Sequence, residues 1–171
     1  MNREDITKYL RMLGEELVAR GVTGEIVVAG GAFMLLVIQN RDTTKDVDAY
    51  FAAEPQAIRD AARVIAEREG LSSDWLNDGV KGFFYETPPV QAWADFPGLR
   101  VYMVTPEYAF ALKAIAGRPE DIGDLRALAA NMGISSSDQA LDIVARYVPP
   151  RLVPPRTQYL IETLFEDEQE A

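Results

Sequence analysis

Hydrophobic residues recur every three or four positions over the first twenty residues of the chain. In a helix of 3.6 residues per turn such positions share one face, which is then buried against the rest of the protein. Asn2 stands directly before this pattern and its side chain can accept from the first free amides, so we expect a helix over residues 2–20. The hydrophobic positions are Ile6, Leu10, Leu13, Leu17 and Val18.

The next segment changes from a strand pattern to a helix pattern. Residues 25–29 are short and rich in β-branched side chains, which predicts a buried strand. Gly30 and Gly31 follow, and residues 32–39 are almost entirely apolar, with the alanine, methionine and leucine content of a buried helix. Polar residues 40–45 predict a loop, and 46–51 predicts a second strand.

The remaining pattern places most helices in the last third of the chain, and residues 71–98 give no clear pattern. We expect an α/β fold, in which a mixed β-sheet is flanked by helices and followed by a helical C-terminal part. We expect residues 1–133 to form the first domain and residues 134–171 a helical appendage with an acidic tail, the two packing as one compact unit. The expected elements are a strand over 99–104 and helices over 55–70, 106–117, 119–133, 136–149 and from 156 onward.

Composition excludes several kinds of chemistry. The 171 residues include no cysteine and no histidine, so thiolate or imidazole metal sites, cysteine nucleophiles and Ser-His-Asp triads cannot form. The net charge of −10 does not favour binding to duplex DNA. The longest apolar run, residues 32–38, is too short to span a membrane, and no signal-peptide pattern is present. We therefore expect a cytoplasmic protein.

Two carboxylates stand two residues apart in the second expected strand. Side chains alternate along a strand, so Asp46 and Asp48 point to one face and Val47 to the other. A divalent cation relieves the repulsion between two such carboxylates, and Mg²⁺ takes one or two carboxylates together with substrate phosphates. A solvated edge-strand face is the alternative interpretation of this pair.

The glycine pair offers a place for an anion. Glycine lets the backbone approach a ligand closely, and the first amides of a helix are free donors. Arg41 and Thr44, in the loop before the aspartates, add side-chain donors for phosphate oxygens. A simple tight turn is the alternative interpretation of Gly30 and Gly31.

In this order the motifs resemble those of the DNA polymerase β-type nucleotidyltransferase superfamily, and more closely its AbiEii-like toxin nucleotidyltransferases and related uncharacterised proteins. The resemblance covers residues 24–130. It is carried by Gly30-Gly31, the stretch Arg41 to Asp48, Asp74 to Asp78, and Thr105 through Lys113 to Arg118, Asp121 and Asp124.

This resemblance implies a Mg²⁺- or Mn²⁺-dependent enzyme that transfers a nucleoside monophosphate from an NTP, such as ATP, to an RNA (tRNA) or protein acceptor. It also implies a place in a toxin–antitoxin system, with an antitoxin as partner. Asp46 and Asp48 would bind the metal, and Lys113 and Asp121 would complete the catalytic set. The nucleotide would be held by Gly30, Gly31, Arg41, Thr44, Lys113 and Arg118.

One departure from the superfamily pattern keeps other functions open. The third strand carboxylate typical of polymerases is not evident, because the only charged residue of 99–104 is Arg100. The chain is then either an enzyme that takes this acid from Asp121 or Asp124, or a catalytically degenerate nucleotide-binding or interaction module of the same fold. A surface lysine is the alternative for Lys113, and favourable contact with a helix dipole is the alternative for Asp121.

Overall fold

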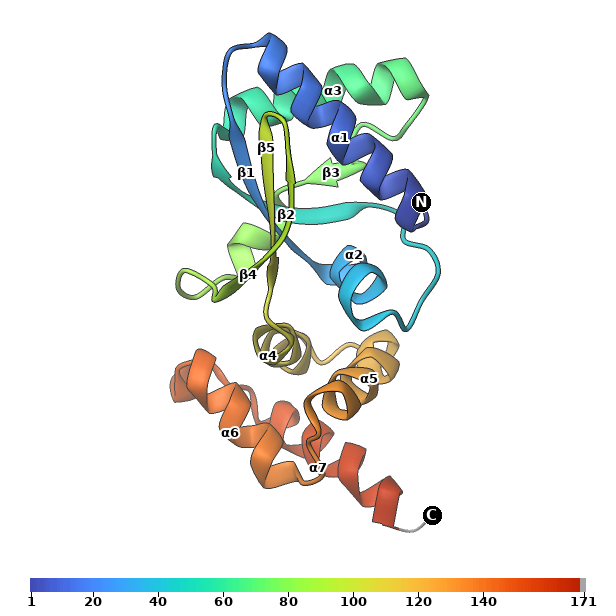
Figure 1. The fold of residues 1–171 in the computed structure, drawn as a ribbon. Coiled ribbons are helices and arrows are strands. Elements are labelled where there is room, and N and C mark those ends of the chain that lie inside the picture. Colours follow the sequence, from blue (N-terminus) through green and yellow to red (C-terminus); the bar gives the residue numbers. More distant parts are fainter. Residues whose placement is uncertain (170–171) are drawn as a thin grey trace. The chain divides into compact units, whose positions relative to one another are not determined.

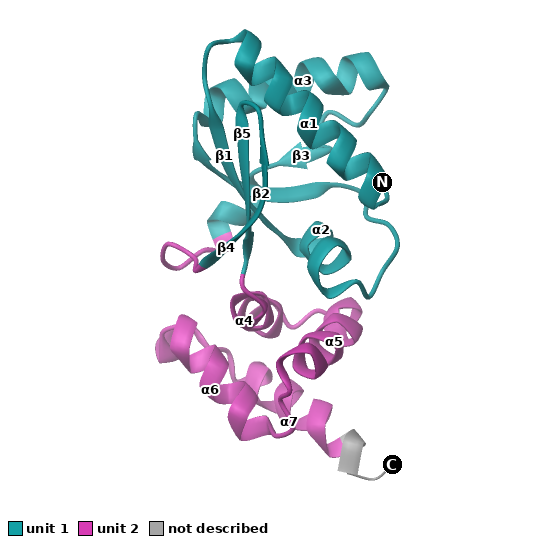
Figure 2. Ribbon diagram, viewed as in Figure 1, with its two compact units in different colours: residues 1–82, 90–104 teal, residues 83–89, 105–171 magenta. Residues whose placement is uncertain are grey.

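A computed structural model describes residues 1–169, with side chains for residues 1–166. The contacts divide the chain into two compact units, which Figure 2 shows in different colours. Unit 1 comprises residues 1–82 and 90–104, and unit 2 comprises residues 83–89 and 105–171. Each unit is described by itself.

Unit 1 is built on a five-stranded mixed sheet with the order β3-β2-β1-β5-β4 (Figure 1). The central strand β1 runs antiparallel to β2 and parallel to β5, while β3 and β4 form the two edges. With the helices around it, this sheet confirms the expected α/β class. The strands are β1 (Gly24–Ala29), β2 (Val47–Ala53), β3 (Leu76–Asn77), β4 (Val90–Phe96) and β5 (Leu99–Val104).

Two long helices pack against this sheet, α1 (Arg3–Ala19) and α3 (Pro55–Glu69) (Figure 1). The expected cap of α1 is present, because the side chain of Asn2 accepts from the amide of Asp5 and the side chain of Asp5 accepts from that of Asn2. The hydrophobic positions expected to line α1 are fully buried, apart from Val18, which is 54% exposed. Periodicity therefore located this helix and its buried face.

The apolar segment after the glycines is helical, as expected, but its geometry changes along its length. It begins as α2 (Gly30–Phe33) and continues as a π-helix, η1 (Met34–Ile38). The amide of Gln39 donates to the carbonyl of Met34 over 2.7 Å, and Gln39 then adopts a left-handed conformation with φ of 62°. The sequence pattern did not predict the π-helix, because burial of an apolar stretch does not distinguish the two helix types.

The stretch 71–98, which showed no clear pattern, contains β3, the 3₁₀ helix η2 (Gly79–Phe83) and β4. Trp75 is only 1% exposed, and its indole nitrogen donates to the carbonyl of Ala62 over 3.0 Å. β3 has only two residues, and no residue of β4 is fully buried, so neither strand shows the alternation of buried and exposed positions that predicts a strand.

Unit 2 contains the expected C-terminal helices. Thr105 and Ser136 cap two of them through their side chains, which accept from the amides of Tyr108 and Gln139 over 3.3 Å each. The helix expected from Pro119 begins with a 3₁₀ turn. The elements are α4 (Pro106–Ala116), η3 (Pro119–Asp121), α5 (Ile122–Met132), α6 (Ser137–Tyr147), η4 (Pro150–Leu152) and α7 (Pro155–Gln169).

In the contacts of the chain, α4 and α5 group with α6 and α7. The expected domain over 1–133 and the expected appendage over 134–171, packing as one compact unit, stay a prediction. The last residues of the expected acidic tail, 170–171, lie outside the described residues. Across the helices of the described chain, no segment is both long and apolar enough to cross a membrane.

Candidate active site

The chain turns at Gly30, where β1 ends and α2 begins. Gly30 has a φ of +61°, a conformation that residues with a side chain adopt only with strain. A Cβ at this position would stand 2.6 Å from Oδ2 of Asp48, well inside van der Waals contact. Glycine is thus required here both by backbone conformation and by the carboxylate beside it.

Gly31 is approached by the loop that leads to β2. A Cβ on Gly31 would lie 2.8 Å from Oγ1 of Thr44 and 3.2 Å from Nη1 of Arg41. The loop therefore folds back over the glycine turn and brings a hydroxyl and a guanidinium to it. Both groups are donors of the kind that bind phosphate oxygens.

The two aspartates lie at the start of β2. Asp46 directly precedes the strand and Asp48 is its second residue, while Val47 between them is fully buried. Asp46 and Asp48 are both partly exposed. Burial, followed by the charges of Asp48 and Asp74, raises the pKa of the Asp46 carboxyl above its usual 3.8. The carboxylates therefore repel one another, and a nearby cation would relieve that repulsion.

Two side chains outside the candidate set, Asn77 in β3 and Asp74 before it, lie near the aspartates. Asn77 is the register partner of Asp48, and the carbonyl of Trp75 accepts from the amide of Val47 over 2.7 Å. This pairing brings Asp74 close enough for its charge to act on Asp46. The resemblance included the stretch 74–78. Its position beside Asp48 depends on the pairing of β3 with β2, which joins residues far apart in the chain and could not be predicted from the sequence.

The donor set of unit 1 fits a small divalent cation in part. Asp46 and Asp48 offer the carboxylate oxygens that Mg²⁺ and Mn²⁺ prefer, and a bound triphosphate would add further oxygen ligands. Among the residues that the structure describes, three or more acidic side chains do not converge as a ready metal cage. The fit is therefore to a cation shared between two carboxylates and a substrate.

The candidate residues of unit 2 form a separate cluster. Nζ of Lys113 lies 2.8 Å from Oδ1 of Asp121 and 2.9 Å from Oδ2 of Asp124. The three side chains are 15%, 13% and 5% exposed, respectively. These contacts tie the end of α4 to η3 and the start of α5. Arg118 is exposed between them, at the N-cap of η3.

The sequence candidates thus fall into two groups. Unit 1 brings together Gly30, Gly31, Arg41, Thr44 and Asp48, with Asp46 next to them along the chain. Unit 2 brings together Lys113 and Asp121, and adds Asp124 as the most deeply buried member. The ammonium of Lys113 is matched by carboxylates within its own unit. The sequence does not predict this pairing, because Lys113 lies in α4 while Asp121 and Asp124 lie in η3 and α5.

A protein-family model matches most of the chain. The family is described as a nucleotidyltransferase of unknown function (DUF6036), and its model matches residues 8–136. Comparisons with curated proteins and with solved structures gave no match. The matched span contains both groups of candidate residues.

Proposed function

Because the chain belongs to this family of nucleotidyltransferases of unknown function, we propose that it transfers a nucleoside monophosphate from an NTP to an acceptor hydroxyl. In this reaction the acceptor oxygen forms a bond to the α-phosphorus. The bond between that phosphorus and the bridging oxygen breaks, pyrophosphate leaves, and the acceptor proton is released to solvent. The observation that supports the proposal best is the convergence of Arg41, Thr44 and Asp48 on the two glycines.

The glycine turn is the proposed phosphate site. Neither Gly30 nor Gly31 has a side chain to block a ligand, and an anion beside Gly31 would meet the guanidinium of Arg41. The hydroxyl of Thr44, which donates to the carbonyl of Asp46, would have to turn to donate to the same anion. Arginine pairs with phosphate through two parallel hydrogen bonds, so Arg41 would fix the orientation of the triphosphate as well as its charge.

Asp46 and Asp48 are the proposed ligands of a divalent cation, Mg²⁺ or Mn²⁺. When bound, such an ion neutralises charge on the phosphates and polarises the α-phosphorus for attack. The raised pKa of Asp46 supports this assignment, because burial and then the charges of Asp48 and Asp74 disfavour its ionised form, which a bound cation would favour.

Lys113, Asp121 and Arg118 enter the proposal through the family resemblance. Lys113 would neutralise triphosphate charge, Asp121 would complete the acidic set, and Arg118 would contact phosphate. Lys113 already forms ion pairs with Asp121 and Asp124. To bind a nucleotide it would either keep these ion pairs or exchange one of them for a phosphate. ATP as the donor, RNA or protein as the acceptor, and a toxin role with an antitoxin partner in the cytoplasm belong to the same proposal.

One observation favours a second candidate function, a catalytically degenerate module that binds nucleotide without transferring it. β5, the neighbour of β1, carries Arg100 as its only charged residue, and that guanidinium lies 3.2 Å from the carboxylate of Glu25. β5 therefore supplies no carboxylate as a third acidic side chain. Such a module would be stabilised by an NTP but would release no pyrophosphate.

A double-label experiment separates the two functions. The protein is incubated with Mg²⁺, bacterial RNA, lysate protein and each NTP, labelled at either the α- or the γ-phosphate. The proposed enzyme attaches α-label and never γ-label to the acceptor, and nuclease or protease digestion then identifies the acceptor class. If the NTP raises the melting temperature but no α-label is transferred, the degenerate module replaces the proposed enzyme.

A further inference from the structure

The first residues of the chain reach the loop that lies over the glycine turn. Nη2 of Arg3 donates to the carbonyl of Leu36 over 2.5 Å. The main chain of Met1 pairs with Thr44, whose amide donates to the Met1 carbonyl over 2.9 Å. The main-chain nitrogen of Met1 donates to the Thr44 carbonyl over 2.8 Å. Both ends of the connection between the helical segment and β2 are therefore held from the start of α1.

The guanidinium of Arg3 supplies a hydrogen-bond donor to a carbonyl near the end of the π-helix. The last carbonyls of a helix lack partners within it, and Leu36 lies in the last turn of η1. Leu36 is only 3% exposed, so water has little access to satisfy its carbonyl. A guanidinium donor gives a charge-assisted hydrogen bond, which is stronger than a neutral one.

The Thr44 contact acts at the other end of the same connection. Oγ1 of Thr44 donates to the carbonyl of Asp46 over 3.1 Å and is the closest atom to a Cβ built on Gly31. The backbone pairing with Met1 therefore helps to fix the position of this hydroxyl beside the glycine turn. Between the two anchors lie Gln39, in its left-handed conformation, and Arg41.

The helix α1 does not need Arg3 for its own stability. Asn2 and Asp5 already form its cap, and its buried face is made by other residues such as Ile6 and Leu10. Arg3 is exposed apart from its guanidinium contact. The contact of Arg3 therefore acts on the last turn of η1, the turn from which segment 39–46 continues.

We propose that Arg3 is a positioning residue, which holds segment 39–46 so that Arg41 and Thr44 face the glycine turn ready for a triphosphate. This inference rests on the proposed function of that turn. Arg3 touches no reacting atom in this account and acts through the loop. Its loss would weaken nucleotide binding by leaving the phosphate donors to be ordered at the moment of binding.

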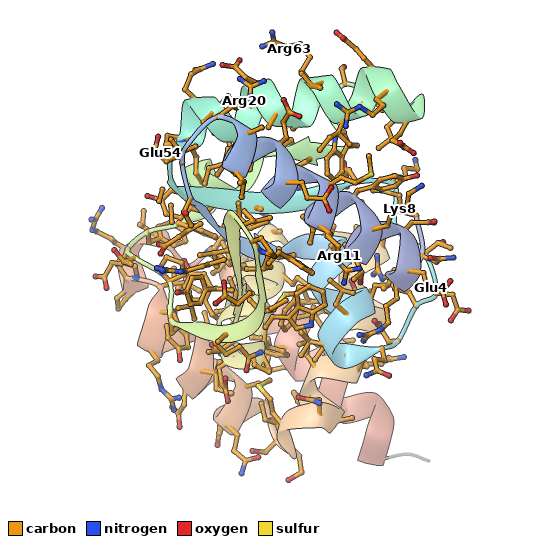
Figure 3. The ribbon with its side chains drawn as sticks, turned by 45° about the horizontal axis from the view of Figure 1, so that its top comes forward. Glu4, Lys8, Arg11, Arg20, Glu54 and Arg63 are labelled. Atoms are coloured by element: carbon orange, nitrogen blue, oxygen red, sulfur yellow. The ribbon has the colours of Figure 1, made fainter. Side chains whose placement is uncertain are left out.

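The test uses Arg3→Met, which keeps the length of the side chain and removes the donor, and Arg3→Lys, which restores a cationic donor. The matched control is Arg11→Met on the same helix (Figure 3). The guanidinium carbon of Arg11 lies 5.6 Å from the centre of the Phe96 ring. Hydrogen exchange of segment 39–46 is measured without nucleotide. KM for magnesium ATP and kcat are measured in the transfer assay.

In Arg3→Met we expect exchange of segment 39–46 to accelerate about tenfold, the factor of one charge-assisted hydrogen bond. KM should rise about tenfold while kcat stays within about twofold, and Arg3→Lys should recover most of both effects. Arg11→Met should match the wild type in each measurement. If Arg3 had a purely structural role, Arg3→Met would instead lower thermal stability and kcat together.

Unchanged exchange in Arg3→Met would overturn the inference, as would an equal rise of KM in Arg11→Met. Failure of the proposed function has a different signature. In that case the wild type itself neither binds nor turns over magnesium ATP, and the role of Arg3 toward a nucleotide is rejected with it. The exchange result then still shows whether Arg3 holds the segment.

Discussion

The carboxylate of Asp48 lies against the backbone of Gly30, so that a single added methyl group on the glycine would come within 2.6 Å of Oδ2. Gly30 directly follows Ala29, which is the last residue of β1 and the register partner of Asp48. The contact joins the proposed phosphate turn to the proposed metal ligand. It leads directly to the first prediction.

Gly30→Ala should abolish transfer and lower the free energy of unfolding by about 1–3 kcal/mol. The new methyl group meets Asp48, and the backbone at φ of +61° is strained for alanine. Gly123→Ala is the matched control, because its methyl group meets no atom within 4 Å and lies within α5. That variant should gain about 0.5–1 kcal/mol from helix propensity. Equal stability and activity in both variants, measured by chemical unfolding and transfer, would contradict the account.

Lys113→Met should lower the free energy of unfolding by on the order of 3 kcal/mol, because it leaves two largely buried carboxylates without their cation. Lys81→Met removes a lysine at 3.2 Å from Asp78 that is 55% exposed, and should change stability by less than about 1 kcal/mol. Thermal unfolding of both variants measures the difference. A similar small loss in each would show that the Lys113 cluster does not stabilise unit 2.

Tyr108→Phe should leave stability unchanged or raise it at neutral pH. Tyr108 is 3% exposed and packs edge-on against Phe84 and Tyr147. Its hydroxyl makes no hydrogen bond of ordinary geometry among the described residues, and the backbone of Tyr85 acts on it only weakly, so its removal costs little. A loss above about 1 kcal/mol in urea unfolding would mean that the hydroxyl makes a contact the structure does not show.

The same tyrosine predicts a dependence on alkaline pH. Burial, followed by the charges of Tyr85 and Glu86, raises the pKa of Tyr108 from 10.0 to about 12. Below pH 10 the phenol is protonated in both states, and between pH 10 and 12 only the unfolded state loses the proton. The free energy of unfolding should therefore fall over this window, and fall less in Tyr108→Phe. Parallel pH profiles for the two proteins would disprove the shift.

The local parts of this structure were readable from the sequence. Periodicity located α1, the caps Thr105 and Ser136 located the starts of two helices, and Gly30 with Asp48 marked the candidate site. These features depend on residues close together in the chain. They therefore leave their signal in spacing and residue type.

The long-range parts were not readable. Arg3 reaches Leu36 across 33 positions, and Asn77 meets Asp48 only because β3 pairs with β2. The bonds of Lys113 to Asp121 and Asp124 depend on the turn between α4 and α5. Each of these contacts is set by tertiary packing, and such contacts leave no periodic pattern in a single sequence.

The central claim is that Asp48 takes part in nucleotidyl transfer and is not simply a charged residue of a strand. The measurement is the attachment of α-phosphate label to RNA or protein in the presence of Mg²⁺, comparing Asp48→Asn with Asp95→Asn, an exposed aspartate of β4. The account predicts that Asp95→Asn transfers label as the wild type does. Asp48→Asn should lose transfer by at least about a thousandfold while unfolding at the same temperature or higher. Full transfer by Asp48→Asn would contradict the account.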